Sequence, residues 1–189
     1  MKFSEAISTI ELVLESGSVP LIIGEAGIGK TSLVKRICKS DNYYLVNIDA
    51  NLLKEGEIGG LPVVENGRTK YATHYKLIEM EEAIENKNYD GVLLFIDELN
   101  RCEHAVQQEL MNLILNREIN GYKLAGNVKI VAAMNPSNKY DGFVDSDYQV
   151  VDMDAAQENR FVWLNMEPDY NQWLNWAMDA GIEQKVIEF

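Results

Sequence analysis

Residues 24–31, Gly-Glu-Ala-Gly-Ile-Gly-Lys-Thr, match the pattern GxxxxGK[ST] in full. Glycines at these positions let the backbone fold tightly around a phosphate with its N–H groups turned inward. Lys30 can then place a point charge on the β and γ phosphates, and the Thr31 hydroxyl can ligate Mg²⁺. A glycine-rich turn that binds nothing is the alternative interpretation. We predict a nucleotide site whose loop residues are Gly24, Gly27, Ile28, Gly29, Lys30, Thr31 and Ser32.

A pair of acids, Asp97 and Glu98, directly follows the apolar run 92–96. An apolar run that ends in an acid places Asp97 at the carboxyl end of a strand, where the ligands of parallel sheets collect. We expect Asp97 to hold Mg²⁺ through water, and Glu98 to polarise an attacking water. Either acid alone could instead cap the helix that follows. Together with a complete phosphate loop, the pair favours nucleotide chemistry.

Short apolar runs alternate with helical patterns along the chain and must position these residues. The pattern predicts strands at 19–23, 43–48, 92–96, 128–134 and 161–166, and helices at 3–15, 31–39, 74–86, 103–117 and 168–180. Pro168 is expected in the first turn of the last helix. Uniformly apolar strands alternating with helices predict an α/β fold of the P-loop NTPase type, with a parallel five-stranded sheet covered on both faces. Residues 58–73 and 119–127 break the alternation and are predicted to be inserted hairpins.

The motifs resemble those of AAA+ ATPases, and within them the MoxR-like, dynein-related group. Residues 97–101, Asp-Glu-Leu-Asn-Arg, are similar to the DE-x-NR Walker B segment of that group. Residues 110–118 are similar to the end of the following helix, and residues 132–136, Ala-Ala-Met-Asn-Pro, to the sensor-1 strand. Residues 158–161, Glu-Asn-Arg-Phe, are similar to the stretch that carries an arginine finger. The resemblance spans about residues 5–167.

This resemblance implies Mg²⁺-dependent ATP binding and hydrolysis, with Glu98 as the catalytic base. It implies that Asn135 orients the attacking water and that Arg160 reaches into the site of a neighbouring subunit. It also implies a homo-oligomer, a hexameric ring in the family, that remodels a protein partner and acts with a von Willebrand A domain protein. The insertion at 58–73 has the position of the family's helix-2 insert, which faces the pore or a partner.

The resemblance divides the chain into a nucleotide-binding α/β domain over residues 1–167 and a C-terminal helix over residues 168–189. That helix is expected to be the start of a lid that is absent, since the family's lid carries a sensor-2 arginine and no arginine follows Arg160. A second hypothesis is therefore a nucleotide-binding assembly module with little turnover. A third is the NTPase subunit of a nucleic-acid machine of the restriction or helicase-loader type. The preference for ATP over GTP stays open.

Charge and composition bear on partners and compartment. The 30 acids exceed the 17 Lys and Arg residues, giving a net charge of −13, which disfavours binding to a phosphate backbone. The longest apolar run, 92–96, is far short of the roughly 20 residues that span a bilayer. Glu5 and Glu11 interrupt the apolar run that a signal peptide needs. We expect a cytoplasmic protein with reduced cysteines.

Three tryptophans could suggest a platform on which bases stack. Trp163 lies in an apolar strand, and Trp173 and Trp176 are three residues apart on a predicted helix. This spacing favours packing in the core for all three. His74 is expected to cap or flank the helix that follows it.

Overall fold

The computed structural model describes residues 1–137, 151, 153, 155–179, 181–183 and 185. The helices are α1 (Phe3–Glu15), α2 (Lys30–Ser40), α3 (Tyr75–Glu85), α4 (His104–Asn116), α5 (Ala155–Glu158) and α6 (Tyr170–Asp179), with a short 3₁₀ turn at Ala50–Leu52. The strands are β1 (Val19–Ile23), β2 (Tyr43–Asp49), β3 (Pro62–Glu65), β4 (Arg68–Tyr71), β5 (Gly91–Asp97), β6 (Glu118–Ile119), β7 (Tyr122–Lys123), β8 (Val128–Met134) and β9 (Phe161–Asn165).

The main sheet contains five strands in the order β2-β5-β8-β1-β9, and all of its pairings are parallel. The predicted α/β fold with a parallel five-stranded sheet is therefore confirmed. Two antiparallel hairpins, β3–β4 and β6–β7, lie outside this sheet. They occupy the two predicted insertions, although the second hairpin begins one residue earlier than expected, at Glu118.

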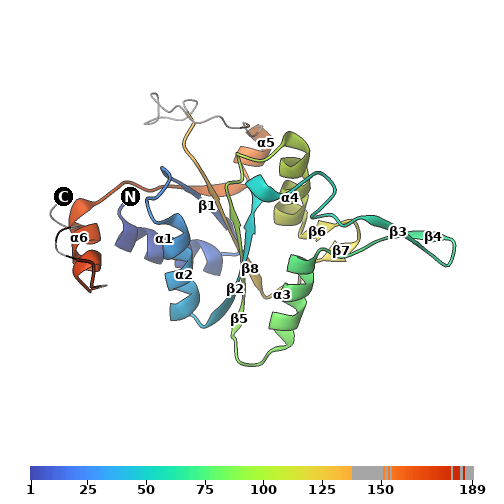
Figure 1. Ribbon diagram of the computed structural model, residues 1–189, viewed down its shortest axis with the longest axis horizontal. Coiled ribbons are helices and arrows are strands. Elements are labelled where there is room, and N and C mark those ends of the chain that lie inside the picture. Colours follow the sequence, from blue (N-terminus) through green and yellow to red (C-terminus); the bar gives the residue numbers. More distant parts are fainter. Residues whose placement is uncertain (138–150, 152, 154, 180, 184, 186–189) are drawn as a thin grey trace.

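Alternate residues of the central strands enter two separate cores. Leu93 and Phe95 of β5 are buried against α1 and α2, whereas Leu94 and Ile96 are buried against α3 and α4. Successive side chains of a strand point to opposite faces, so a strand covered on both faces must be apolar at every position. Figure 1 shows α1 and α2 on one side of the sheet and α3 and α4 on the other.

The register of the sheet brings the carboxyl ends of four strands to one edge. Ile23 of β1 is paired with Met134 of β8, and Asp49 of β2 is paired with Asp97 of β5. The residues that follow these strands therefore lie close together, although they are far apart in the sequence. This edge carries the candidate site.

The last helix differs from the prediction at its start. α6 begins at Tyr170, and Pro168 lies outside it. The carboxylate of Asp169 accepts a hydrogen bond from the backbone N–H of Gln172 at 3.0 Å, so an acid rather than a proline begins the helix. Asp169 also pairs with Lys2 at 2.9 Å, and this contact lowers the pKa of the Asp169 carboxyl. The start of α6 is thereby held against the start of α1.

His74 caps α3 as expected, because its Nδ1 accepts a hydrogen bond from the backbone N–H of Lys76 at 3.3 Å. Residues 180, 184 and 186–189 of the predicted C-terminal segment lie outside the described residues. Within the described part of the chain, the helices are too short or too polar to cross a membrane.

Candidate nucleotide site

The phosphate loop follows β1 and ends where α2 begins. Gly29 precedes the helix with φ +101°, a backbone conformation that a side chain would strain. Lys30 is the first helical residue and is buried, and its Nζ donates to the carbonyl oxygens of Gly24 at 2.7 Å and Glu25 at 3.2 Å. Burial lowers the pKa of the Lys30 ammonium, while Asp97 and Glu98 oppose that shift. A buried ammonium held by carbonyl oxygens can exchange those oxygens for a phosphate.

The Thr31 hydroxyl and the Asp97 carboxylate lie side by side, with Thr31 Oγ1 donating to Asp97 Oδ2 at 3.0 Å. A hydroxyl and a carboxylate are the few oxygen ligands that Mg²⁺ takes from a protein when phosphates and waters supply the rest. The described residues hold no cluster of three His, Cys, Asp or Glu side chains that could bind a metal alone. The donor set thus fits a magnesium ion that arrives with a nucleotide.

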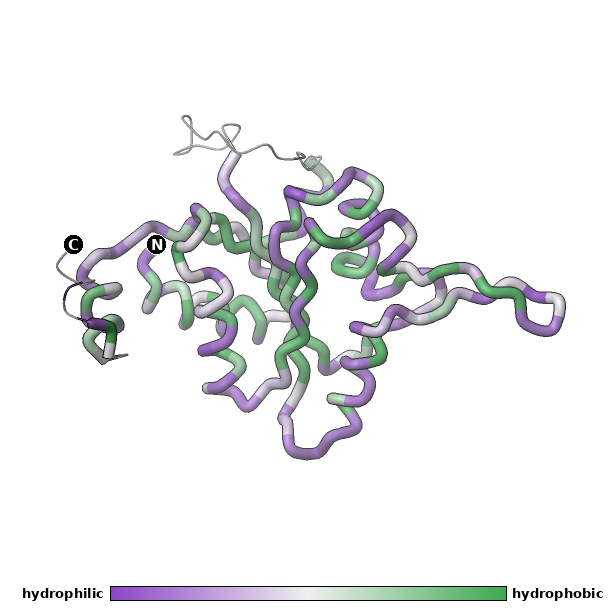
Figure 2. Tube along the Cα trace, viewed as in Figure 1, coloured by the Kyte–Doolittle hydropathy of each residue, from purple (hydrophilic) through white to green (hydrophobic). Residues whose placement is uncertain are grey.

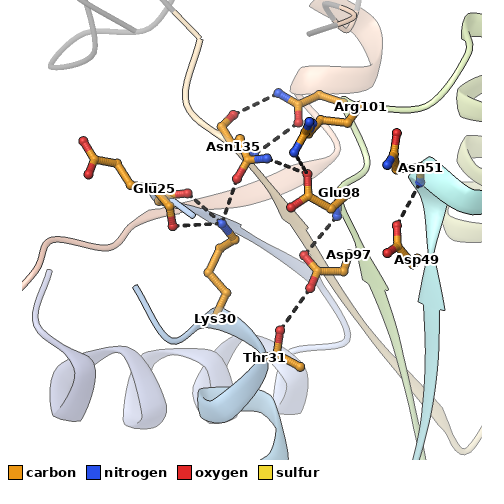
Figure 3. Close-up of polar contacts among 11 residues, drawn as sticks. Glu25, Lys30, Thr31, Asp49, Asn51, Asp97, Glu98, Arg101 and Asn135 are labelled. Atoms are coloured by element: carbon orange, nitrogen blue, oxygen red, sulfur yellow. Dashed lines mark hydrogen bonds and ion pairs between the residues drawn. The ribbon is translucent and has the colours of Figure 1, made fainter. Parts of the chain in front are cut away.

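Asn135 lies between the phosphate loop and the second acid. Its side chain is fully buried; its Oδ1 accepts from Lys30 Nζ at 3.0 Å, and its Nδ2 donates to Glu98 Oε2. Figure 3 shows this continuous series of contacts from Lys30 through Asn135 to Glu98. The structure therefore brings together five of the residues that the sequence predicted, from three different elements of the chain.

The side chain of Asn100 holds the backbone of Asn135 in place, a role that was not predicted from the sequence. Asn100 Nδ2 donates to the carbonyl oxygen of Asn135 at 2.9 Å, and the backbone N–H of Asn135 donates to Asn100 Oδ1 at 3.1 Å. Both side chains are buried, so each bond satisfies a group that has left water. Asn100 was visible in the DE-x-NR resemblance, but nothing in the pattern showed that it would clamp another loop.

The backbone at Glu98 is left-handed, with φ +57°, a conformation that costs a residue with a side chain about 1–3 kcal/mol. It is held by the hydrogen bond from the Glu98 N–H to Asp97 Oδ1 at 2.9 Å and by the next N–H, of Leu99, which donates to Ala133 O at 3.0 Å. The Glu98 carboxylate also pairs with Arg101 Nη1 at 3.5 Å. The local backbone thus turns this carboxylate toward Asn135 rather than toward solvent.

A cavity of about 860 Å³ adjoins the loop and lies between α1, α2 and α6. Its volume is in the range of small-molecule pockets. The expected core packing is wrong for Trp173 and Trp176, which are 41% and 58% exposed and line this cavity. Packing holds for Trp163, whose indole N–H donates to Glu158 O at 2.9 Å. The other lining residues include Phe3, Gly27, Ile28, Gly29, Ser32, Arg36, Tyr170, Gln172 and Asn175.

Arg160 lies apart from the other predicted site residues. It is exposed and directly precedes β9, whose first residue, Phe161, is paired with the first residue of β1, Val19. The phosphate loop follows the opposite end of β1. A five-residue strand is about 17 Å long, so Arg160 lies near the far edge of the sheet and away from Lys30 of its own chain.

Residues 20–160 match the family model described as AAA domain (dynein-related subfamily), which covers most of the chain. The chain belongs to this AAA family. Membership supports nucleotide binding and hydrolysis in general terms. Comparison with curated proteins gives no match.

Many solved structures are similar to this AAA domain, and two of them illustrate the shared fold. One is a protein from Cytophaga hutchinsonii named as a candidate ATPase, with a TM-score of 0.64 and 17% identity over 96% of this chain and 51% of that one. The other is NtrX from Brucella abortus, with a TM-score of 0.54 and 17% identity over 95% of this chain and 43% of that one. The chain thus spans about half the length of these proteins.

Proposed function

We propose that this AAA domain binds Mg-ATP and hydrolyses it, with Glu98 as the general base. The observation that carries the proposal is the buried series Lys30–Asn135–Glu98 beside the Thr31–Asp97 pair. This arrangement combines a cation for phosphates, two oxygen ligands for a metal and a carboxylate for a water at one edge of the sheet.

Each residue then has a separate task. The N–H groups of residues 27–31 and the Lys30 ammonium would bind the phosphates, and Thr31 and Asp97 would hold Mg²⁺. The magnesium ion, when bound, supplies charge neutralisation on the phosphate oxygens. When nucleotide binds, Asn135 would release Lys30 and form a hydrogen bond with the attacking water instead. Glu98 would deprotonate that water. Arg101, whose Nη1 lies 3.5 Å from the Glu98 carboxylate, would help to hold that carboxylate in position.

The cavity between α1 and α6 is the proposed position of the base. It is continuous with residues 27–29 of the loop, and it offers aromatic rings to a purine and polar groups such as Asn175 to the base edge. Replacing Trp176 with Leu should weaken the binding of ATP about tenfold while leaving the binding of inorganic tripolyphosphate unchanged, because one lost stacking contact is worth roughly 1–3 kcal/mol. Equal weakening of both ligands would show that the base lies elsewhere.

Hydrolysis would also need a second copy of the chain. Arg160 is exposed and remote from its own phosphate loop, so it would stabilise the transition state only in the site of a neighbour, as arginine fingers do. This supports a homo-oligomer, a ring in the family resemblance, that remodels a protein partner. On the basis of the family resemblance, we propose a von Willebrand A domain protein as that partner.

The direct test of Glu98 is the rate of phosphate release by Glu98→Gln. We expect hydrolysis to fall by roughly 10²–10⁴, the usual contribution of a general base, with ATP affinity retained. Glu103→Gln is the matched control, since Glu103 is exposed and makes no capping hydrogen bond with its side chain. If Glu98→Gln hydrolyses ATP at the rate of the control, the base is assigned wrongly.

The test of Arg160 is complementation between two inactive variants. Arg160→Ala has an intact base but supplies no finger, and Glu98→Gln supplies a finger but has no base. We expect each variant to be nearly inactive alone and their mixture to recover activity that rises with protein concentration. A mixture no more active than its two components would exclude catalysis across a subunit boundary.

A further inference from the structure

The β3–β4 hairpin projects from the body of the protein at the end of its longest axis (Figure 1). All residues of both strands are exposed. Leu61, Val63, Val64 and Tyr71 are 66%, 44%, 78% and 49% exposed, respectively, and Figure 2 shows apolar residues on the projecting part. A two-stranded hairpin that buries neither face is marginally stable in water. It therefore gains stability when another element covers it.

The root of the hairpin is nonetheless held firmly. The N–H of Ala72 donates to Leu61 O at 2.9 Å, and Asn120 Nδ2 donates to Gly59 O at 2.9 Å. A Cβ on Gly60, which has φ +84°, would lie 2.0 Å from the carbonyl oxygen of Ala72. The hairpin is therefore anchored at its root, where Asn120, in the turn between β6 and β7, binds the backbone of Gly59.

A cleft of about 390 Å³ lies at this root, between β4 and the turn that joins β6 to β7. Three consecutive residues of β4, Thr69 to Tyr71, form one wall, and residues 119–122 form another. Consecutive residues line a cleft when the edge of a strand, rather than one face, borders it. The free edge of β4 therefore faces this cleft.

The register shows which backbone groups lie on that edge. The turn residues Asn66 and Gly67 both have positive φ, as in a two-residue type I′ hairpin. In such a hairpin the pair next to the turn, Glu65 and Arg68, exchanges hydrogen bonds, and every second pair after it does the same. Thr69 and Tyr71 belong to the alternate pairs, so their N–H and C=O groups point away from β3 and into the cleft.

The charge of the hairpin is opposite to that of the whole chain. Residues 61–72 carry Arg68 and Lys70 but a single acid, Glu65, in a protein of net charge −13. Lys70 pairs with Glu65 and also lines the cleft, which leaves the positive charge of Arg68 in excess. A ligand of this edge should therefore be acidic as well as extended.

We propose that an extended, acidic polypeptide segment of a partner protein adds to β4 as a third strand and lies in this cleft. Main-chain hydrogen bonds to Thr69 and Tyr71 would provide affinity, and Arg68 and the Tyr71 side chain, which borders the cleft, would provide selectivity. The bound segment would belong to the protein that this AAA domain is proposed to remodel, so any link between binding and ATP hydrolysis rests on the proposed function. The binding itself does not require hydrolysis and can be tested separately.

The probe is fluorescently labelled, reduced and carboxymethylated α-lactalbumin, an acidic polypeptide without a stable fold, and the readout is fluorescence anisotropy. Thr69→Pro removes the outward N–H of β4, and Val64→Pro removes the outward N–H of the cross-strand partner on β3. Both prolines strain the same non-hydrogen-bonded pair, so the two variants are matched. We expect Thr69→Pro to weaken binding at least tenfold and Val64→Pro to weaken it no more than about threefold, because tenfold corresponds to about 1.4 kcal/mol, close to one or two backbone hydrogen bonds.

A charge variant gives an independent measurement. Arg68→Glu should weaken binding about fivefold at low salt, and this loss should shrink as salt is added. Equal effects of the two prolines, the absence of binding, or tighter binding of a single-stranded oligonucleotide than of the polypeptide would each overturn the inference. ATP hydrolysis by the same variants identifies which proposal has failed: unchanged hydrolysis with no polypeptide binding refutes this inference alone.

Discussion

The polar groups of the nucleotide site are bonded to one another, whereas those on the outer edge of the β3–β4 hairpin have no partner strand among the residues that the structure describes. At the site, Lys30, Asn135 and Glu98 are joined to one another, and Asn100 satisfies the backbone of Asn135. On the hairpin, both faces are exposed and the outward groups of β4 border an open cleft. One region must break contacts before it can bind, whereas the other forms contacts that it does not yet have.

This difference separates two kinds of recognition. A ligand of the site must replace internal hydrogen bonds. The site should therefore bind ligands with many negatively charged oxygens and discriminate against ligands with few of them. A ligand of the hairpin replaces water, so affinity there depends on how many backbone groups and apolar side chains it covers. Disturbing one region should therefore leave the other nearly unchanged. The first predictions below test the site itself, and the removal of the hairpin tests this independence.

The largest effect is expected from Lys30→Ala. Loss of the ammonium removes a charge-assisted bond to phosphate worth about 1.5–3 kcal/mol, so we expect ATP affinity to fall roughly 10- to 100-fold. Lys35→Ala, an exposed lysine farther along α2, should bind as the unmodified protein does. The anisotropy of a fluorescent ATP analogue measures both. Equal affinities of the two variants would remove Lys30 from the site.

Asn100→Ala should act on chemistry and stability more than on binding. It leaves the N–H and C=O of Asn135 without their partners, at a cost of about 1–3 kcal/mol for each buried group. We expect kcat to fall about tenfold while KM changes less than threefold, because Asn135 and Glu98 lose their alignment while Lys30 and the loop amides remain. Asn112→Ala, an exposed change on α4, is the control. A rise in KM with unchanged kcat would contradict this positioning role.

A smaller effect is expected at high pH from the two buried thiols, Cys38 and Cys102. Burial raises the pKa of Cys38 and of Cys102 from 9.0 to about 11. The unfolded chain therefore releases these protons first, and the free energy of unfolding should fall as pH rises from 9 to 11. Urea denaturation at several pH values should show a shallower fall for the Cys38→Ala, Cys102→Ala double variant. Part of the fall should remain, because burial also raises the pKa of Tyr122, to about 12.

The smallest effect is expected when the hairpin itself is removed. Replacing residues 62–71 with a short Gly-Ser linker should change basal ATP hydrolysis less than about twofold, since the exposed hairpin lies outside the main sheet and its cores. Malachite-green detection of phosphate would measure the rate. A loss of basal hydrolysis comparable to that of Asn100→Ala would show that the two regions are energetically coupled.

Residues with a local signature were predictable from the sequence. The glycines and Lys30 of the loop, the acids at the end of β5 and the alternation of strands and helices all follow from short-range patterns. Their approach in space follows from one further rule, that the carboxyl ends of parallel strands share an edge. The predicted fold and the proximity of Lys30, Thr31, Asp97, Glu98 and Asn135 both rest on this rule.

Contacts between distant segments could not be predicted in this way. The hydrogen bonds between Asn100 and Asn135 depend on the positions of two loops 35 residues apart. The presence of an asparagine in a motif does not show which residue it will bond. Trp173 and Trp176 have the helical spacing of core residues, yet α6 packs against the start of α1 and exposes them to the cavity. The predicted start of α6 was wrong because Pro168 and Asp169 are both residue types that begin helices. The structure uses Asp169 as the cap, and helix propensity alone does not show which of the two will do so.

The central claim is that the loop amides and the Lys30 ammonium close on a nucleoside triphosphate with Mg²⁺ held by Thr31 and Asp97. Isothermal titration calorimetry of the unmodified protein with ATP, in the presence and absence of Mg²⁺, tests it most directly. We predict one binding site per chain, with heat that is much reduced without Mg²⁺ and in Asp97→Asn. The absence of binding heat for both ATP and GTP with Mg²⁺ present would contradict the account.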